Sequence, residues 1–183
     1  KLMYNGALGV GWVIAFPQPD RLGGDDLFNT ALSASPSVLA MFENTNGSYP
    51  PTQGTVILGD GARGLRASGV IQNTPELRKN VSQGLATARA DVDQLVRRMP
   101  LLLQGEQADQ WVPTFGTEVL KILSNSGTYI INTEANEIVG IKLPNLGELS
   151  TDAVGRRWVS WIDSPRTTLD EMDVDGKFVF VGV

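Results

Sequence analysis

Cysteine and histidine are both missing from this chain of 183 residues. Their absence excludes zinc fingers, iron–sulfur clusters, thiol chemistry and any catalytic triad or proton relay that needs an imidazole. Positive charge is also scarce, with 15 Lys and Arg against 20 Asp and Glu and a net charge of −5. Proteins that bind a phosphate backbone need a basic surface, so we expect no nucleic acid partner. The sequence likewise predicts no metal and no cofactor.

Long apolar runs are missing as well. The longest, Ala7–Phe16, has about half the length of a membrane-spanning helix. The chain starts at Lys1 and stops within the apolar segment Gly176–Val183, so we expect it to be one domain of a longer protein. Its length and its apolar content of 42% are those of an ordinary globular unit. We therefore predict a single domain over residues 1–183.

The two apolar segments near the chain ends, Ala7–Phe16 and Gly176–Val183, have the strongest strand pattern. Neither has a polar face, which predicts neighbouring strands buried on both sides in the middle of a sheet. A helix is predicted over Asp25–Ser33, and a third apolar segment follows at Ser37–Phe42. This strand–helix–strand order makes a βαβ unit. The predicted fold class is α/β, a single-domain layered sandwich with a mixed, mostly parallel central sheet flanked by helices.

The remaining segments are shorter. A helix is predicted over Pro113–Ser124, where the apolar residues form one stripe. Alternating or β-branched segments predict further strands at Thr55–Leu58, Ser68–Ile71, Val96–Leu103 and Arg157–Ile162, and a hairpin made by Tyr129–Asn132 and Glu137–Leu143.

An acidic turn that contains Asp91 and Asp93 precedes the paired residues Arg97 and Arg98. Arginine forks suit carboxylates, and the four residues are close in sequence, so we predict that Arg97 or Arg98 pairs with Asp91 or Asp93. Arg156 and Arg157 form a second such pair. Adjacent residues of a strand point to opposite faces, so we expect one arginine of each pair to face a partner and the other to face water.

Trp158 and Trp161 lie three residues apart on the predicted strand Arg157–Ile162 and should therefore face opposite ways. We expect one of them in the core and the other in a groove or an interface. With the acidic turn and the arginine pair, they complete our set of candidate ligand-binding residues: Asp91, Asp93, Arg97, Arg98, Trp158 and Trp161.

No residue is singled out as catalytic. A serine nucleophile has no histidine base to activate it. The segment Gly59–Gly64 fits the spacing G-x-G-x-x-G, but no adequate helix is predicted to follow it, so we interpret it as a flexible glycine loop.

Several segments share the order and spacing of a known family. Gly6-Ala7 leads into the first apolar strand, and Asp91-x-Asp93 precedes Val-Arg-Arg-Met-Pro-Leu at 96–101. The chain closes with Gly-Lys-Phe-Val-Phe-Val-Gly at 176–182. In these features, nearly from end to end, it resembles the type-two CHASE domain, the extracytoplasmic sensory module of bacterial cyclases, histidine kinases and related receptors. Gln94 departs from the pattern, because glycine is usual at this position after the acidic turn.

The resemblance implies a receptor input domain on the periplasmic face of the bacterial inner membrane. One membrane helix would precede the domain and others would follow, so the membrane is reached through segments outside these residues. A cyclase or kinase output domain would also lie outside, and the domain itself would not be an enzyme. We expect an unknown small-molecule or protein ligand, and a homodimer in the full-length receptor.

Two other functions stay open on the residues alone. One is a hydrolytic or transfer enzyme of α/β type that uses carboxylates, which a deep pocket with two facing carboxylates would favour. The other is a structural dimerisation module, which a flat surface with a large symmetric apolar contact would favour.

Overall fold

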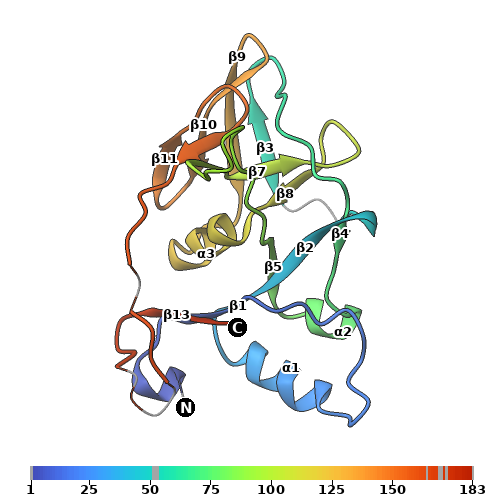
Figure 1. Cartoon of the computed structure of the whole chain (residues 1–183), viewed down its shortest axis with the longest axis vertical. Helices are drawn as coiled ribbons and strands as arrows, with labels where there is room; N and C mark the ends of the chain where they lie inside the picture. The colour runs from blue at the N-terminus through green and yellow to red at the C-terminus, as the bar shows by residue number, and fades with distance from the viewer. Residues whose placement is uncertain (1, 51–53, 164, 169–170, 172, 183) are drawn as a thin grey trace.

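A computed structural model describes residues 2–50, 54–163, 165–168, 171 and 173–182 (Figure 1). Strand β1 (Gly9–Trp12) lies between β13 (Phe178–Val181) and β2 (Ser37–Ser48), and β5 (Ser82–Leu85) pairs with the other edge of β2. All of these pairings are parallel, whereas β4 (Val70–Ile71) pairs antiparallel with the later part of β2. The prediction that the two apolar ends of the chain are neighbouring strands is therefore confirmed.

Helix α1 (Asp25–Ser33) joins β1 to β2, which confirms the predicted βαβ unit and both predicted ends of the helix. Asp25 and Asp26 occupy its first turn, where carboxylates interact favourably with the positive end of the helix dipole. Its buried residue Leu32 packs with Leu39 of β2 on one face of the sheet. The short helix α2 (Pro75–Arg78) contributes Leu77 to the same cluster.

Helix α3 (Phe115–Leu123) covers the opposite face of the parallel sheet. Phe115 and Val119 pack on Val38 and Ala40 of β2, which alternate with Leu39 and so point away from α1. In Figure 1, α3 lies between the parallel sheet and a second group of strands at the other end of the molecule.

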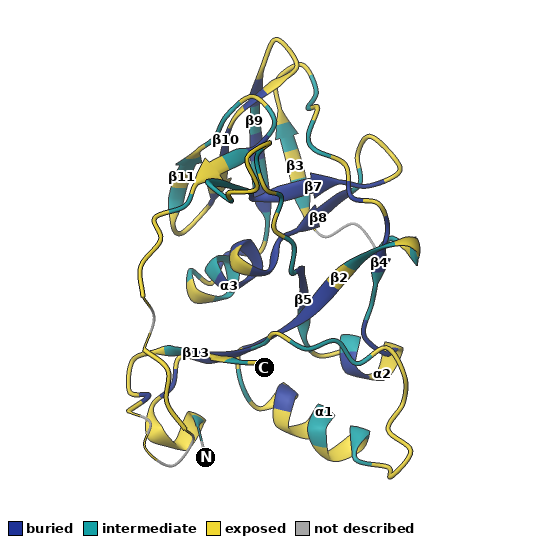
Figure 2. Cartoon of the chain, viewed as in Figure 1, coloured by how far each residue is buried: buried dark blue, intermediate teal, exposed yellow. Residues whose placement is uncertain are grey.

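The second group contains a sheet in the order β11-β10-β9-β3. Its strands β9 (Tyr129–Glu134) and β10 (Glu137–Leu143) form the predicted hairpin, and β3 (Thr55–Leu58) has its predicted bounds. Strand β11 (Gly147–Ser150) was not predicted. A buried cluster that includes Tyr129, Ile131 and Trp111 fills this part of the molecule (Figure 2).

Two short ribbons complete the strands. β6 (Arg98–Pro100) pairs antiparallel with β12 (Arg156–Trp158), and β7 (Leu102–Gln104) pairs antiparallel with β8 (Trp111–Pro113). The predicted strand Val96–Leu103 is thus wrong as a single element, because its two halves have different partners. Pro100 has no amide hydrogen with which to continue the first ladder. The predicted helix start at Pro113 is also wrong, because this residue ends β8 and the helix begins at Phe115.

The prediction that the terminal strand lies in the middle of the sheet is wrong. Among the described residues, β13 has one neighbouring strand, β1. Val179 is buried, whereas 58% of Phe180 is exposed. Phe178 and Phe180 lean across Gly9 and Gly11 of β1, where an added Cβ atom would approach their rings to about 3 Å. The strand therefore has one well-covered face and one face that is covered only in part.

The predicted strand over Ala7–Phe16 is also shorter than expected, because β1 spans Gly9–Trp12. A single 3-10 turn, η1 (Met3–Asn5), precedes it. Taken together, the chain is a mixed α/β protein in which the described strands form several sheets, and the described helices α1, α2 and α3 lie beside the parallel sheet. No helix among the described residues is long and apolar enough to cross a membrane.

Candidate functional site

The acidic turn and the strand ribbon β6–β12 bring the candidate arginines and aspartates together. The amide of Gln94 donates to the carbonyl of Asp91 at 2.9 Å, and the amide of Asp91 donates to the carbonyl of Leu95 at 2.9 Å. Gln94 has a φ of 66°, a left-handed conformation that glycine adopts more readily. The CHASE-like sequence pattern has glycine at this position. The turn is therefore kept here with a non-glycine residue whose left-handed backbone is strained.

Both arginines of the pair contact the acidic turn. Arg97 Nη2 lies 2.6 Å from Asp93 Oδ2, and Arg97 Nη1 lies 3.3 Å from Asp91 Oδ2. Arg98 Nη2 lies 3.2 Å from Asp91 Oδ1. The predicted pairing is thus confirmed. Hydrogen bonds from Arg97 and from the amide of Leu95 hold the pKa of Asp93 below its ordinary value.

The expectation that one arginine of each pair faces a partner and the other faces water is confirmed for Arg156, which contacts Asp152, and the exposed Arg157. It is wrong for Arg97 and Arg98. It assumed that both residues belong to one strand, but β6 begins at Arg98, and Arg97 precedes the strand. The strict alternation of a strand therefore does not apply to the pair. As a result both guanidinium groups reach Asp91, from two directions.

A second turn, at Asp152–Arg156, extends the cluster. Asp152 Oδ2 lies 2.8 Å from Arg156 Nε and 3.4 Å from Arg98 Nη1. Burial raises the pKa of Asp152, but hydrogen bonds from the backbone amide and guanidinium of Arg156 outweigh it, so the pKa is lower than usual. Asp152 thus holds Arg98 and Arg156 side by side. Sequence reasoning missed this residue, although its spacing to Arg156 repeats the spacing of Asp93 to Arg97.

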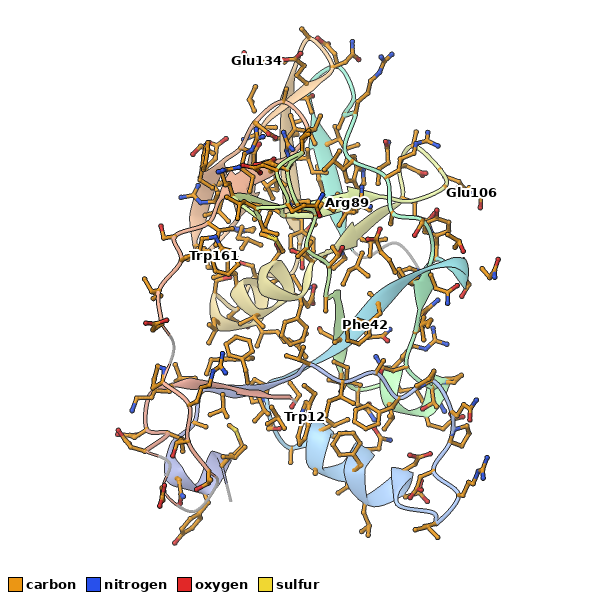
Figure 3. All side chains as sticks on the ribbon, in the orientation of Figure 1. Trp12, Phe42, Arg89, Glu106, Glu134 and Trp161 are labelled. Carbon is orange, nitrogen blue, oxygen red and sulfur yellow. The ribbon has the colours of Figure 1, made fainter. Side chains whose placement is uncertain are left out.

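The two tryptophans are both at the surface, with 69% of Trp158 and 71% of Trp161 exposed. The expectation that one of them lies in the core is wrong, because β12 ends at Trp158 and Trp161 lies beyond it. Trp158 is paired with Arg98 across the ribbon, and the Arg98 guanidinium lies 5.6 Å from the centre of its ring. Trp161, labelled in Figure 3, donates from Nε1 to the carbonyl of Val96 at 2.8 Å.

Two hollows share Arg98 and Arg156 among their lining residues. The first hollow, about 760 Å³, is lined by residues 90–93 of the acidic turn together with Arg97, Arg98 and Arg156. The second hollow, about 450 Å³, is lined by Arg98, Arg156, Arg157 and Trp158, with residues 150–152 and Ser160. The candidate residues Asp91, Asp93, Arg97 and Arg98 therefore share the first hollow. Trp158 lies at the second hollow, and Trp161 lines neither of them.

A separate polar cluster, not predicted from the sequence, lies under α3. The Glu118 side chain is fully buried, Lys121 Nζ lies 2.7 Å from its Oε1, and the Tyr129 hydroxyl donates to its Oε2. Burial, the negative charge of Glu118 and this hydrogen bond raise the pKa of the Tyr129 hydroxyl above its ordinary value. The cluster joins α3 to β9 within the core, so it stabilises the packing of two elements.

Two motifs of the sequence can also be placed. The glycine segment Gly59–Gly64 follows β3 and leads into no helix, as the interpretation as a loop predicted. Among the described residues, no three acidic side chains are placed so that they could hold a metal ion together.

A comparison with known protein families gives a match. The model of the CHASE2 domain family matches residues 1–183, which is the whole chain. Comparison with curated proteins gives no match, and comparison with solved structures gives none either.

Proposed function

The chain belongs to the CHASE2 domain family, a family of extracytoplasmic sensory domains, and we propose that it is the periplasmic input domain of a bacterial transmembrane receptor. In this proposal the domain binds a small molecule or a protein ligand and passes the signal to a cytoplasmic cyclase or kinase. The observation that carries the proposal is the match of the family model to all 183 residues. The proposed receptor is a homodimer anchored by membrane segments outside these residues.

The ligand site in this proposal is the pair of hollows around Arg98. A sensor must bind its ligand more tightly in one arrangement than in another, because a ligand of equal affinity for both shifts nothing. Arg98 contacts Asp91 in the acidic turn and Asp152 in the second turn, at 3.2 Å and 3.4 Å. These contacts are long for charge-assisted hydrogen bonds, so a ligand has little to displace.

The chain also offers a route for the signal. In the order of elements, β12 of the ribbon is followed by β13 at the edge of the parallel sheet. The amide of Val159 donates to the carbonyl of Arg97 at 2.9 Å, so the chain just after β12 is attached to Arg97. We propose that ligand binding shifts the ribbon relative to the parallel sheet and that this shift is passed on towards the membrane.

The test uses the natural full-length protein in bacterial membranes. Protease added outside intact spheroplasts should degrade this domain and leave the output domain protected, and protease should reach both after lysis. In the same membranes, Arg98→Ala should alter the response of cyclase or kinase output to periplasmic extract. The matched variant Arg21→Ala removes an exposed arginine that lines neither hollow and should leave output unchanged. A domain protected in intact spheroplasts would refute the proposal.

A further inference from the structure

The second hollow has an unusual charge for this protein. Arg98, Arg156 and Arg157 line it, and Asp152 is the one carboxylate among its lining residues. The chain as a whole has a net charge of −5. A concentration of guanidinium groups on an acidic protein attracts anions locally and repels cations.

The hollow also has polar atoms left without a partner. Arg98 Nε and Thr151 Oγ1 are buried, and neither makes a hydrogen bond in the described structure. Buried donors and acceptors are nearly always paired, so two orphans beside one hollow need an explanation. Arg156 bonds Asp152 through Nε, and both of its terminal nitrogens lack a partner among the described residues. The terminal nitrogens of Arg156 are therefore available to a ligand in the hollow.

The guanidinium groups of Arg156 and Arg157 are held in place before any ligand arrives. Asp152 Oδ2 contacts both Arg98 and Arg156, and Asp152 Oδ1 accepts the backbone amide of Arg156 at 2.8 Å. Arg157 Nη1 donates to the carbonyl of Ser150 at 3.1 Å, which fixes the third guanidinium group. Side chains that are already ordered lose less entropy on binding, so the site gains affinity from this arrangement.

An aromatic surface borders the same hollow. The Arg98 guanidinium lies 5.6 Å from the centre of the Trp158 ring, yet 69% of this tryptophan is exposed. An exposed indole beside a guanidinium offers a flat apolar surface for the body of a small molecule. The volume of the hollow, about 450 Å³, lies within the usual range for small-molecule sites.

From these observations we infer that the second hollow binds a small organic carboxylate, with its carboxylate on Arg156 and Arg98 and its apolar body against Trp158. This inference rests on the proposed sensor function and specifies the class of ligand. Planar guanidinium forks match the geometry of a carboxylate, and the terminal nitrogens of Arg156, which lines the hollow, have no other partner among the described residues. Arg157, an exposed lining residue, adds electrostatic attraction for the carboxylate but is not needed for the shape of the hollow.

The experiment measures binding to the 183-residue chain by titration calorimetry and tryptophan fluorescence. Benzoate, succinate and acetate are the probes, benzamide is the neutral match for benzoate, and inorganic phosphate is the competing anion. We expect benzoate to bind, benzamide to fail, and affinity to fall as sodium chloride is raised. Arg156→Gln should weaken benzoate binding by about tenfold or more, because a charge-assisted pair is lost.

Two further variants guard against loss of folding. Arg157→Gln changes an exposed lining residue, so the fold should be retained while binding weakens by a smaller factor. Arg21→Gln removes the same charge at a residue that does not line the hollow and should leave binding unchanged. Equal binding of benzoate and benzamide, preference for phosphate, or no saturable binding of any carboxylate at millimolar concentration would overturn the inference.

The two proposals fail in different ways. If no carboxylate binds but the domain is periplasmic and output depends on Arg98, the ligand class is wrong and the sensor function stands. If the domain is protected in intact spheroplasts, the sensor function is wrong whatever the domain binds.

Discussion

The three tyrosines of the chain provide a graded test of its hydrogen bonds. The Tyr129 hydroxyl donates to the buried carboxylate of Glu118. The Tyr49 hydroxyl donates to the neutral carbonyl of Ala67 at 2.8 Å in a partly buried position. Tyr4 is 94% exposed, and its hydroxyl makes no hydrogen bond in the described structure. Substitution by phenylalanine removes one oxygen in each case and leaves the ring, so differences among the variants report on the hydroxyl.

The expected losses follow from the partners. Tyr129→Phe leaves a buried carboxylate oxygen without its donor, and hydrogen bonds to charged groups contribute about 1.5–3 kcal/mol. Tyr49→Phe removes a neutral hydrogen bond, which contributes about 1 kcal/mol. Tyr4→Phe should change the free energy of unfolding by less than about 0.5 kcal/mol, as surface substitutions usually do. For a chain of this size a loss of about 2 kcal/mol corresponds to a fall in Tm of roughly 4–8 °C.

Urea unfolding followed by tryptophan fluorescence and circular dichroism measures these differences. The slope of the free energy against urea should be the same in all variants, because none of them changes the surface exposed on unfolding. If Tyr129→Phe is as stable as Tyr4→Phe, the Glu118–Lys121–Tyr129 cluster does not stabilise the core. If Tyr49→Phe costs more than Tyr129→Phe, the ranking by partner charge is wrong.

The same variant has a predicted pH dependence. The pKa of Tyr129 is raised in the folded state, so the folded protein keeps its proton while an unfolded tyrosine loses its proton near pH 10. Stability contributed by this group is therefore fully present below pH 10 and declines as the pH rises above it. Between about pH 10 and pH 11 the advantage of the wild type over Tyr129→Phe should shrink by about 1 kcal/mol. An advantage that stays constant over this range would contradict the raised pKa.

Two matched pairs test the parallel sheet. Val179→Asp places a charge at a buried position of β13 and should abolish soluble expression. Phe180→Asp changes a largely exposed neighbour and should give folded protein. If soluble protein is lost in both variants, or in neither, the alternation of buried and exposed residues in β13 is wrong. Gly84→Ala would bring a Cβ atom to 2.5 Å from the Cα atom of Phe115 and should lower Tm markedly. Gly116→Ala, in α3, adds a Cβ atom with no neighbour within 4 Å apart from adjacent residues and the backbone of its own helix, and should raise the free energy of unfolding by about 1 kcal/mol. Thermal melts in which Gly84→Ala is the more stable of the two variants would refute the packing of α3 on β5.

The elements that sequence patterns predicted well are those set by local chemistry. Helix α1 has its predicted bounds because Asp25 and Asp26 favour its start and because Phe28 and Leu32, four residues apart, lie on the face that packs on the sheet. The β9–β10 hairpin is predictable because its turn residues Ala135 and Asn136 separate two segments of strand-forming residues. The contact of Arg97 with Asp93 is also local, since the two residues are four apart along the chain.

The terminal strand β13 shows a feature that sequence patterns did not predict, the number of strands beside it. The alternation of valine and phenylalanine in β13 predicted a strand correctly, but it could not show how far neighbouring elements extend over it. Val179 packs with Ala7 and Val174, whereas the ring of Phe180 makes a contact with Phe115 and remains largely exposed. An apolar strand at the edge of a sheet and one in the middle have the same composition, because composition does not specify the number of neighbours.

The candidate site depends on the register between β6 and β12, which no local sequence pattern predicts. Arg98 meets Asp152 because β6 and β12 pair with Trp158 opposite Arg98, although 54 residues separate the arginine from the aspartate. A slip of one residue would turn every side chain of β12 to the other face and remove Trp158 from the guanidinium. The spacing of Asp152 to Arg156 repeats that of Asp93 to Arg97, and it was visible in the sequence as a second turn of the same kind. What the sequence lacked was the pairing that sets the two turns side by side, and this pairing is what gathers the guanidinium groups around both hollows.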